Sequence, residues 1–221
     1  MRCGAVFFDL DGTLVDSNAL HVAAWVEVFA DAGHDLAAGT VAGRIGMGAD
    51  NFVPALIPGA DARTARKLGD RHGAIFKDRY LGQVQAFPDA RALVARVRDS
   101  GRRVVLASSA SQAELDHYVK LLDLAALIDA NTTIDDVPHS KPAPDIFVAA
   151  REKIAPMAAA AIVAVGDTPY DMEPARYCGM VGIALRSGGF GDAALRDAGA
   201  AAVYDDAAAL LAGFEESLLA G

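Results

Sequence analysis

The stretch AVFFDLDGTLVDS, residues 5–17, places Asp9 and Asp11 at the end of an apolar run. Such a run is typical of a buried strand, which does not normally hold carboxylates because a charged group loses its hydration there. Gly12 follows at once and offers a point where the chain can turn. Taken alone, the two aspartates are best explained by an Asx-type turn leading into this glycine. Whether they do more depends on what other segments bring to the same place.

Later apolar runs have the same form as the first, because each is followed by a polar turn and then by a helical pattern. They are RRVVLASS (102–109), AAIVAVGD (160–167), MVGIALR (180–186) and, more weakly, AAVYD (201–205). Alternating strands and helices predict a parallel sheet with helices on both faces, which is the Rossmann-like, doubly wound α/β fold. A further edge strand is predicted near 127–129.

The interval between the first and second runs does not follow this alternation. Residues 16–87 contain no convincing strand and hold several helical patterns. About 70 residues are too many for a simple crossover loop in a compact domain. We therefore predict a helical domain over 16–87, inserted into an α/β core (catalytic) domain formed by 1–15 and 88–221.

The net charge limits the kinds of partner that the protein can have. The chain carries 20 basic and 29 acidic residues, a formal charge of −9, and no long run of lysine or arginine. This composition speaks against nucleic-acid binding, which depends on basic side chains that neutralise phosphates. An anionic ligand would have to be held locally, by a metal ion or by a few placed cations.

The cysteines and the apolar segments indicate in which cellular compartment the protein is expected. Cys3 and Cys178 show no spacing typical of metal binding, and we interpret them as ordinary thiols. Asp9 interrupts the only apolar stretch near the N-terminus, so no signal peptide is expected. No run reaches the roughly 20 apolar residues of a membrane span. We expect a soluble cytoplasmic protein, a monomer or weak dimer, with no membrane or nucleic-acid partner.

Other predicted strands bring polar groups to the edge where Asp9 and Asp11 lie. Ser108 ends the second run and Asp167 ends the third. Ligands of open parallel sheets bind beyond the carboxyl ends of the strands, so these groups are expected to converge. Carboxylates packed together without a cation would repel each other and lose hydration. Such an oxygen-rich site suits Mg²⁺, which takes one or two carboxylates and completes its shell with water and phosphate oxygens.

Two further segments, SKPAPD (140–145) and GDTPYD (166–171), supply candidate groups for the same site. In the first, two prolines stiffen the entry to a helix and hold Lys141 where it could neutralise a phosphoryl group. A solitary lysine is more often a solvated surface charge. The second segment places Asp167 and Asp171 around a helix start, where they could cap the helix, bind a metal ion, or do both.

Together, these segments resemble the motifs of the haloacid dehalogenase superfamily of phosphohydrolases. The matching stretches are DLDGTLVDS, ASSA, SKPAPD and GDTPYD, and they occur in the family's order along essentially the whole chain. The predicted helical domain corresponds to the family's inserted helical cap. Within the family, the chain is similar to phosphoglycolate phosphatases and to β-phosphoglucomutase-like proteins. The ordered set is much more specific than any single motif.

The resemblance implies a role for each matching residue. Asp9 would be the nucleophile that attacks phosphorus, and Asp11 would be the general acid and base. Mg²⁺ would be the cofactor, held by Asp9, by Asp11 through its backbone carbonyl, and by Asp167. The remaining implied roles are phosphoryl binding by Ser108 and Lys141, and support of the site by Thr13 and Asp171.

Asp11 also separates relatives by their chemistry. Relatives that resemble true dehalogenases, and relatives that cleave phosphonates, lack an aspartate at this position. The resemblance therefore implies a phosphoric monoester hydrolase that acts through an aspartyl-phosphate intermediate. The expected substrate is a small phosphorylated metabolite, and a sugar phosphate is slightly favoured.

The alternative is a β-phosphoglucomutase-like hexose-phosphate mutase. His21, twelve residues after Asp9, and Arg44 in GRIGMG are candidate substrate contacts. A polar group near a helix start and a surface ion pair explain these two residues about equally well. Residues 166–168 have the Gly-Asp-Thr form that resembles phosphatases, and Lys77 is only a weak equivalent of the mutases' lysine. A phosphatase is therefore the preferred interpretation.

Overall fold

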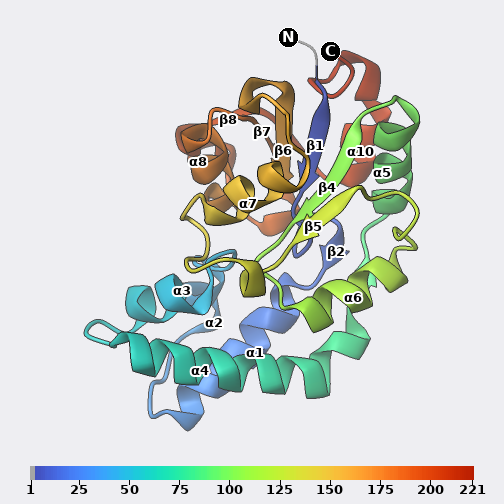
Figure 1. The fold of residues 1–221 in the computed structure, drawn as a ribbon. Helices are drawn as coiled ribbons and strands as arrows, with labels where there is room; N and C mark the ends of the chain where they lie inside the picture. The colour runs from blue at the N-terminus through green and yellow to red at the C-terminus, as the bar shows by residue number, and fades with distance from the viewer. Residues whose placement is uncertain (1–2) are drawn as a thin grey trace.

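The main element of the structure, a computed structural model that describes residues 3–221, is a parallel sheet. Residues 1 and 2 of the predicted core domain lie outside the described residues. The strands of the sheet are β1 (Ala5–Phe8), β4 (Arg103–Ala107), β5 (Ala130–Thr132), β6 (Ile162–Gly166), β7 (Val181–Leu185) and β8 (Ala200–Tyr204). Their order is β5-β4-β1-β6-β7-β8, and each neighbouring pair is parallel. The predicted α/β fold is confirmed (Figure 1).

Strand β1 lies at the centre of the sheet, and all of its residues are buried. Val6 and Phe8 pack into the core on one face, whereas Ala5 and Phe7 pack into the core on the other. Side chains of a strand alternate between the two faces, so a strand that is covered on both sides needs apolar residues at every position. The unbroken apolar run before Asp9 is thus the consequence of a two-sided core.

Helices cover the two faces in separate groups (Figure 1). Helices α5 (Ala90–Asp99) and α10 (Ala207–Ala212) pack on the face of Val6 and Phe8. Helices α7 (Asp145–Lys153) and α8 (Pro169–Tyr177) pack on the face of Phe7, and α9 (Asp192–Ala198) packs beside α8. Helix α6 (Gln112–Leu121) follows β4. Across residues 3–221, no helix combines the length and apolarity that crossing a membrane would need.

The helices that come before α5 in the chain lie beyond the carboxyl ends of the strands (Figure 1). They are α1 (Asn18–Asp31), α2 (Ala38–Ala42), α3 (Ala49–Leu56) and α4 (Ala62–Ile75), and a π-helical turn (Phe76–Tyr80) continues α4. Helix α4 packs against both α1 and α3. Trp25, Phe29 and Phe52 pack against one another inside this group. The helical group therefore has an apolar core of its own.

A short ribbon ties the two ends of this helical group together. Strand β2 (Val15–Asp16) pairs antiparallel with β3 (Gln85–Ala86). The prediction that 16–87 contains no strand is wrong at these positions. Each strand has only two residues, too few to show the period-two pattern by which a strand is recognised in a sequence.

The edge strand β5 (Ala130–Thr132) begins just after the predicted position at 127–129. Leu127 and Ile128 belong to the turn that precedes it. The carboxylate of Asp129 fixes this turn to β4, because its Oδ2 accepts hydrogen bonds from the Val104 N–H at 2.8 Å and from Arg98 at 2.6 Å. The apolar residues that suggested a strand instead belong to a turn and pack against the core from there.

Candidate active site

Adjacent strands deliver polar residues to one edge of the sheet. Asp9 directly follows β1, Ser108 follows β4 and Asp167 follows β6. Strand β1 lies between the other two and pairs in parallel with both, so the residues after these strands emerge side by side. All three are buried. The convergence that was predicted for the carboxyl edge is present in the structure.

Lys141 lies at the centre of this edge and is 1% exposed. Its Nζ contacts Asp9 Oδ1 at 2.6 Å and Asp171 Oδ1 at 2.7 Å, and it donates to the Ala107 carbonyl at 3.1 Å. Burial alone would lower the pKa of Lys141, but Asp171 and Asp9 raise it above its usual value. The ammonium therefore stays charged, and the interpretation of Lys141 as a solvated surface residue is wrong.

Asp171 has two tasks, one for each carboxylate oxygen. Its Oδ2 accepts hydrogen bonds from the Thr168 N–H at 3.1 Å and from the Thr168 hydroxyl at 2.7 Å, which caps helix α8. Its Oδ1 binds Lys141. Capping fixes the carboxylate in place, so α8 orients the lysine through Asp171.

Asp167 is held by residues from the loop after β1. Thr13 donates its hydroxyl to Asp167 Oδ1 at 3.0 Å, and Asn18 donates its amide to Oδ2 at 2.9 Å. Gly12 and Gly188 approach this carboxylate so closely that a Cβ at either position would clash with it. Gly12 also has a φ of +74°, which favours glycine. The cradle around Asp167 thus depends on residues with small or absent side chains.

The carboxylates of Asp9, Asp167 and Asp171 form a group that fits a divalent cation. Each offers an oxygen, and these oxygens lie within 4.8 Å of one another in a buried place. Burial raises the pKa of Asp9 to about 7, and burial beside Asp171 raises the pKa of Asp167 well above its usual value. Lys141 balances only part of this charge. A hard, oxygen-rich donor set with excess negative charge is the kind that Mg²⁺ prefers.

Asp11 points away from this group. Its Oδ1 accepts hydrogen bonds from Ser17 Oγ at 2.6 Å and from Tyr118 Oη at 2.9 Å, and lies 3.1 Å from His21 Nε2. Burial alone would raise the pKa of Asp11, but His21 and the two hydroxyls lower it below its usual value. The sequence-based metal set included Asp11 through its backbone and left Asp171 in support. In the structure it is the Asp171 carboxylate that lies beside those of Asp9 and Asp167.

Ser108 is positioned by its own backbone neighbours. Its N–H donates to the Thr132 carbonyl at 3.2 Å, and its Oγ accepts from the Ala110 N–H at 3.0 Å. Within residues 3–221 the Ser108 hydroxyl donates no hydrogen bond of its own. Its O–H is therefore available to a ligand at this edge.

The helical group contacts the carboxyl edge of the sheet through α3 and the loop before it. Asp50 Oδ2 accepts from the Ser140 N–H at 3.2 Å, and Asn51 Nδ2 donates to the Ser140 carbonyl at 3.3 Å. Arg44 is exposed, and its guanidinium lies 3.5 Å from the Tyr170 hydroxyl in α8. The candidate contact Arg44 is therefore found at the rim of the site, next to the helix that carries Asp171.

The other candidate contact, His21, is part of a half-buried pair of imidazoles. Its Nδ1 lies 3.3 Å from His72 Nε2, and its ring stacks on Phe76 with centroids 3.7 Å apart. Burial alone would lower the pKa of His21, but Asp11 raises it. Burial and the neighbouring His21 hold the pKa of His72 well below its usual value. When His21 is protonated, its ring can donate to Asp11 and to His72 at once.

Sequence reasoning missed several residues that contact the site. Asn18 lies just after the DGTLVDS stretch, and its position there was the only available signal. Tyr118 and His72 have no spacing to Asp11 that could reveal them, because tertiary packing alone brings them there. Ser187, whose hydroxyl donates to the Gly12 carbonyl at 2.6 Å, belongs to the segment 186–190 that follows β7. The place of 186–190 after a strand end predicts, from the sequence alone, that this segment lines the rim of the site, although it does not single out Ser187.

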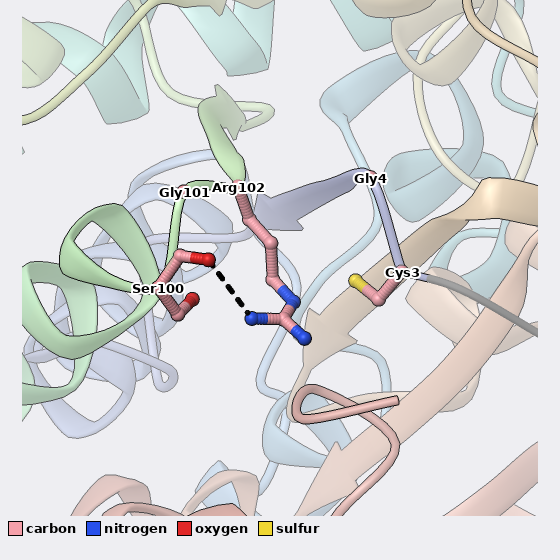
Figure 2. Close-up of a pocket in the computed structure, with 5 residues that line it drawn as sticks. All are labelled: Cys3, Gly4, Ser100, Gly101 and Arg102. Carbon is pink, nitrogen blue, oxygen red and sulfur yellow. Dashed lines mark hydrogen bonds between the residues drawn. The ribbon is translucent and has the colours of Figure 1, made fainter.

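A separate cavity of about 240 Å³ lies at the opposite edge of the sheet. Figure 2 shows its lining residues, which include Gly4, just before β1, and Arg102, just before β4. Arg102 donates to the Ser100 carbonyl at 3.3 Å and to the Ala220 carbonyl at 2.6 Å. The chain's own C-terminal carbonyls thus occupy this arginine, and the cavity is not part of the carboxylate site.

Comparison with known proteins places these features in a family. The model of a hydrolase family, described as haloacid dehalogenase-like hydrolase, matches residues 3–179. A plasmid-encoded phosphoglycolate phosphatase of Cupriavidus necator is 34% identical over 217 residues, which cover 95% of this chain and 92% of that protein. The chloroplastic protein SUPPRESSOR OF QUENCHING 1 of Arabidopsis thaliana is 30% identical over 93% of this chain, which spans only 20% of that protein.

Solved structures give the same result. The crystal structure of a hydrolase from Pseudomonas syringae superimposes with a TM-score of 0.88 and 32% sequence identity. The match covers 96% of this chain and 98% of that one, so it includes both the sheet and the helical group.

Proposed function

Because the chain belongs to the family of haloacid dehalogenase-like hydrolases, we propose that it is a Mg²⁺-dependent phosphatase of a small phosphorylated metabolite. The observation that carries this proposal is the contrast between the surroundings of Asp9 and those of Asp11 at the carboxyl edge of the sheet. Asp9 lies against Lys141 and two further carboxylates, whereas Asp11, two residues on, lies against hydrogen-bond donors. These surroundings support a role for Asp9 toward the phosphoryl group and a role for Asp11 in proton transfer.

In the first step, a carboxylate oxygen of Asp9 attacks phosphorus and the bond from phosphorus to the ester oxygen breaks. Asp11 transfers its proton to that departing oxygen, which leaves as an alcohol. Lys141 and the Ser108 hydroxyl would bind the phosphoryl oxygens, since the lysine is charged and the hydroxyl is free to donate. The product of the step is phospho-Asp9.

In the second step, water attacks the phosphorus of phospho-Asp9 and Asp11 takes up a proton of that water. The bond between phosphorus and the Asp9 oxygen breaks, which releases inorganic phosphate and restores both aspartates. Asp11 is ionised when it acts as the base because it gave up its proton in the first step, and its lowered pKa favours this charged form. The same residue therefore serves as acid first and as base afterwards.

Asp9, Asp167 and the backbone carbonyl of Asp11 would hold Mg²⁺, and Asp171 would support the site through Lys141 and through its place beside the other two carboxylates. Bound Mg²⁺ would neutralise these carboxylates and draw electron density from the phosphoryl group. Thr13 would support the site by holding Asp167 in place.

Residues 16–87 would form a cap over a catalytic core made of 1–15 and 88–221. The contacts of Asp50 and Asn51 with Ser140 support this division, because they join the helical group to the loop of Lys141. A cap that closes on this edge would exclude bulk water from the phosphoryl group. His21 and Arg44 are the cap residues that we propose as substrate contacts, with a sugar phosphate as the favoured substrate. The protein would act in the cytoplasm as a monomer or weak dimer.

A hexose-phosphate mutase is the second candidate, favoured by the contact of His21 with Asp11. Lys77, the weak equivalent of the mutases' lysine, is exposed on the π-helical turn, which gives the mutase no further support. A mutase would convert one isomer into another with little release of inorganic phosphate. Measuring both products from the same sugar phosphate distinguishes the two candidates.

The test is a phosphate-release screen over a panel of phosphorylated metabolites, with and without Mg²⁺. We expect release that requires Mg²⁺ and that Asp9→Asn abolishes. Sugar phosphates, polyol phosphates, phosphoglycolate and nucleotide monophosphates belong in the panel. Release by Asp9→Asn at the wild-type rate would show that Asp9 is not the nucleophile.

A further inference from the structure

Tyr118 lies on α6, a helix that contributes no residue to the four motifs. Its side chain is fully buried, and its hydroxyl lies 2.9 Å from Asp11 Oδ1. At this distance the phenol O–H donates a hydrogen bond to the Asp11 carboxylate, which can only accept.

The donors around Asp11 converge on a single oxygen. Ser17, His21 and Tyr118 all meet Oδ1, whereas Oδ2 has no hydrogen-bond partner among residues 3–221. An oxygen that already accepts three hydrogen bonds has no lone pair left for a proton of its own. When Asp11 is neutral, its proton therefore belongs on Oδ2.

Tyr118 comes from a different part of the fold than the other two donors. Ser17 and His21 lie at the start of α1, in the helical group that we propose as the cap. Tyr118 belongs to α6, whose start is fixed by a capping box in which Glu114 accepts from the Ser111 N–H at 2.7 Å and from its hydroxyl. Its ring packs in the main core cluster. Tyr118 is thus a donor that stays with the core if the cap moves.

We propose that Tyr118 is a positioning residue for proton transfer by Asp11, fixing Oδ1 so that Oδ2 faces the leaving group. This inference rests on the proposed phosphatase function. In the first step, the Oδ2–H bond breaks and an O–H bond forms on the departing ester oxygen as its bond to phosphorus breaks. In the second step, the attacking water loses a proton to Oδ2. Tyr118 itself gains and loses no proton.

The test is Tyr118→Phe, measured as kcat/KM on two esters. One is the alkyl phosphate that the wild type hydrolyses fastest in the screen, and the other is p-nitrophenyl phosphate. An alkoxide leaves only with a proton, whereas p-nitrophenolate leaves without one. General acid catalysis contributes about 10²–10⁴-fold, so losing its alignment should lower kcat/KM for the alkyl ester about 10- to 100-fold. The value for p-nitrophenyl phosphate should change less than about twofold, since its departure needs no general acid.

The ratio of the two kcat/KM values is independent of how much of a preparation is folded, because both are measured on the same sample. A variant of reduced stability therefore still gives a valid answer at a temperature where thermal unfolding shows it to be folded. Tyr204→Phe is the matched control: it also removes a phenol hydroxyl, from β8, and should leave both values unchanged. An equal loss on both esters, or no loss on either, would overturn the positioning role of Tyr118.

Asp11→Asn separates a failure of this inference from a failure of the proposed function. If Asp11 is the general acid, Asp11→Asn should show the same selective loss on the alkyl ester, and a larger one. A selective loss in Asp11→Asn without one in Tyr118→Phe would reject Tyr118 alone. An Asp11→Asn variant that hydrolyses the alkyl ester like the wild type would reject the proposed function itself.

Discussion

Asp9 and Asp11 are the same residue type, two positions apart, and they lie in opposite surroundings. Asp9 shares a buried place with two other carboxylates and one lysine, which leaves it with a pKa of about 7. Asp11 is held by two hydroxyls and an imidazole, and its pKa is lowered. Neighbours that move the pKa values of two carboxyl groups apart are how one site gives them different tasks. The neighbours of Asp9 all come from the proposed core, whereas those of Asp11 come from α6 of that core and from the start of α1.

The largest effect should come from removing Lys141, whose ammonium group contacts Asp9. Lys141→Met leaves Asp9 and Asp171 buried without their partner, which should cost about 3 kcal/mol of unfolding free energy. The same change removes a charge from the proposed phosphoryl site and should lower kcat about 10²–10³-fold. Chemical denaturation and steady-state kinetics measure the two effects.

Lys153→Met is the matched control for this change. Lys153 also binds an aspartate, Asp136, at 3.2 Å, but both side chains are more than one third exposed. Exposed ion pairs contribute about 0–1 kcal/mol, so stability and activity should both stay close to wild type. Equal stability losses for the two lysines would mean that burial does not distinguish the Lys141 pair.

A second effect, of intermediate size, should come from Mg²⁺ itself. At a tenfold excess over its dissociation constant, a bound ion should stabilise the protein by about 1.4 kcal/mol. Thermal unfolding with and without MgCl₂ measures this without any substrate. Asp167→Asn should lose the stabilisation, whereas Asp11→Asn should keep it, because the carboxylate of Asp11 points away from the group. If Asp11→Asn also lost the stabilisation by Mg²⁺, the Asp11 carboxylate would belong to the metal site, and the contrast drawn between Asp9 and Asp11 would be wrong.

The smallest effect should come from His72, which reaches Asp11 only through His21. His72→Phe removes the contact between His72 Nε2 and His21 Nδ1 but keeps an aromatic ring against Trp25, whose centroid lies 4.2 Å from that of His72. One hydrogen bond contributes about 1 kcal/mol, so kcat/KM for an alkyl phosphate should fall about fivefold. His34→Phe, at an exposed position, serves as control. A drop as large as that of Asp11→Asn would give His72 a more direct role.

The surroundings of Asp9 could be predicted from the sequence to a much greater extent than the surroundings of Asp11. Asp9 and Asp167 each follow an apolar run, and parallel strands carry their carboxyl ends to one edge, so local pattern and a general rule of the fold suffice. The place of Lys141 is consistent with its position directly before the two prolines that lead into a helix. The burial of the lysine, however, emerged only from the packing of α7 and α8 around it.

The neighbours of Asp11 could not be predicted, for a physical reason. Tyr118 is more than 100 residues away in the chain and His72 about 60, and neither belongs to a periodic or spaced pattern that includes Asp11. Their approach results from how α6 and α4 pack, which is decided by apolar residues elsewhere on those helices. The two-residue strands β2 and β3 escaped prediction for a related reason, since pairing across a long separation leaves no local trace.

The most direct test of the central claim is to locate the phosphoryl group on the enzyme. Asp11→Asn should still be phosphorylated by p-nitrophenyl phosphate, which needs no acid, but should hydrolyse the intermediate slowly because the base is missing. Rapid acid quench and mass spectrometry of the peptide that contains residues 5–17 should then find one phosphoryl group on Asp9. A phosphoryl group on another residue, or release of phosphate with none on the enzyme at any time, would contradict the division of tasks between Asp9 and Asp11.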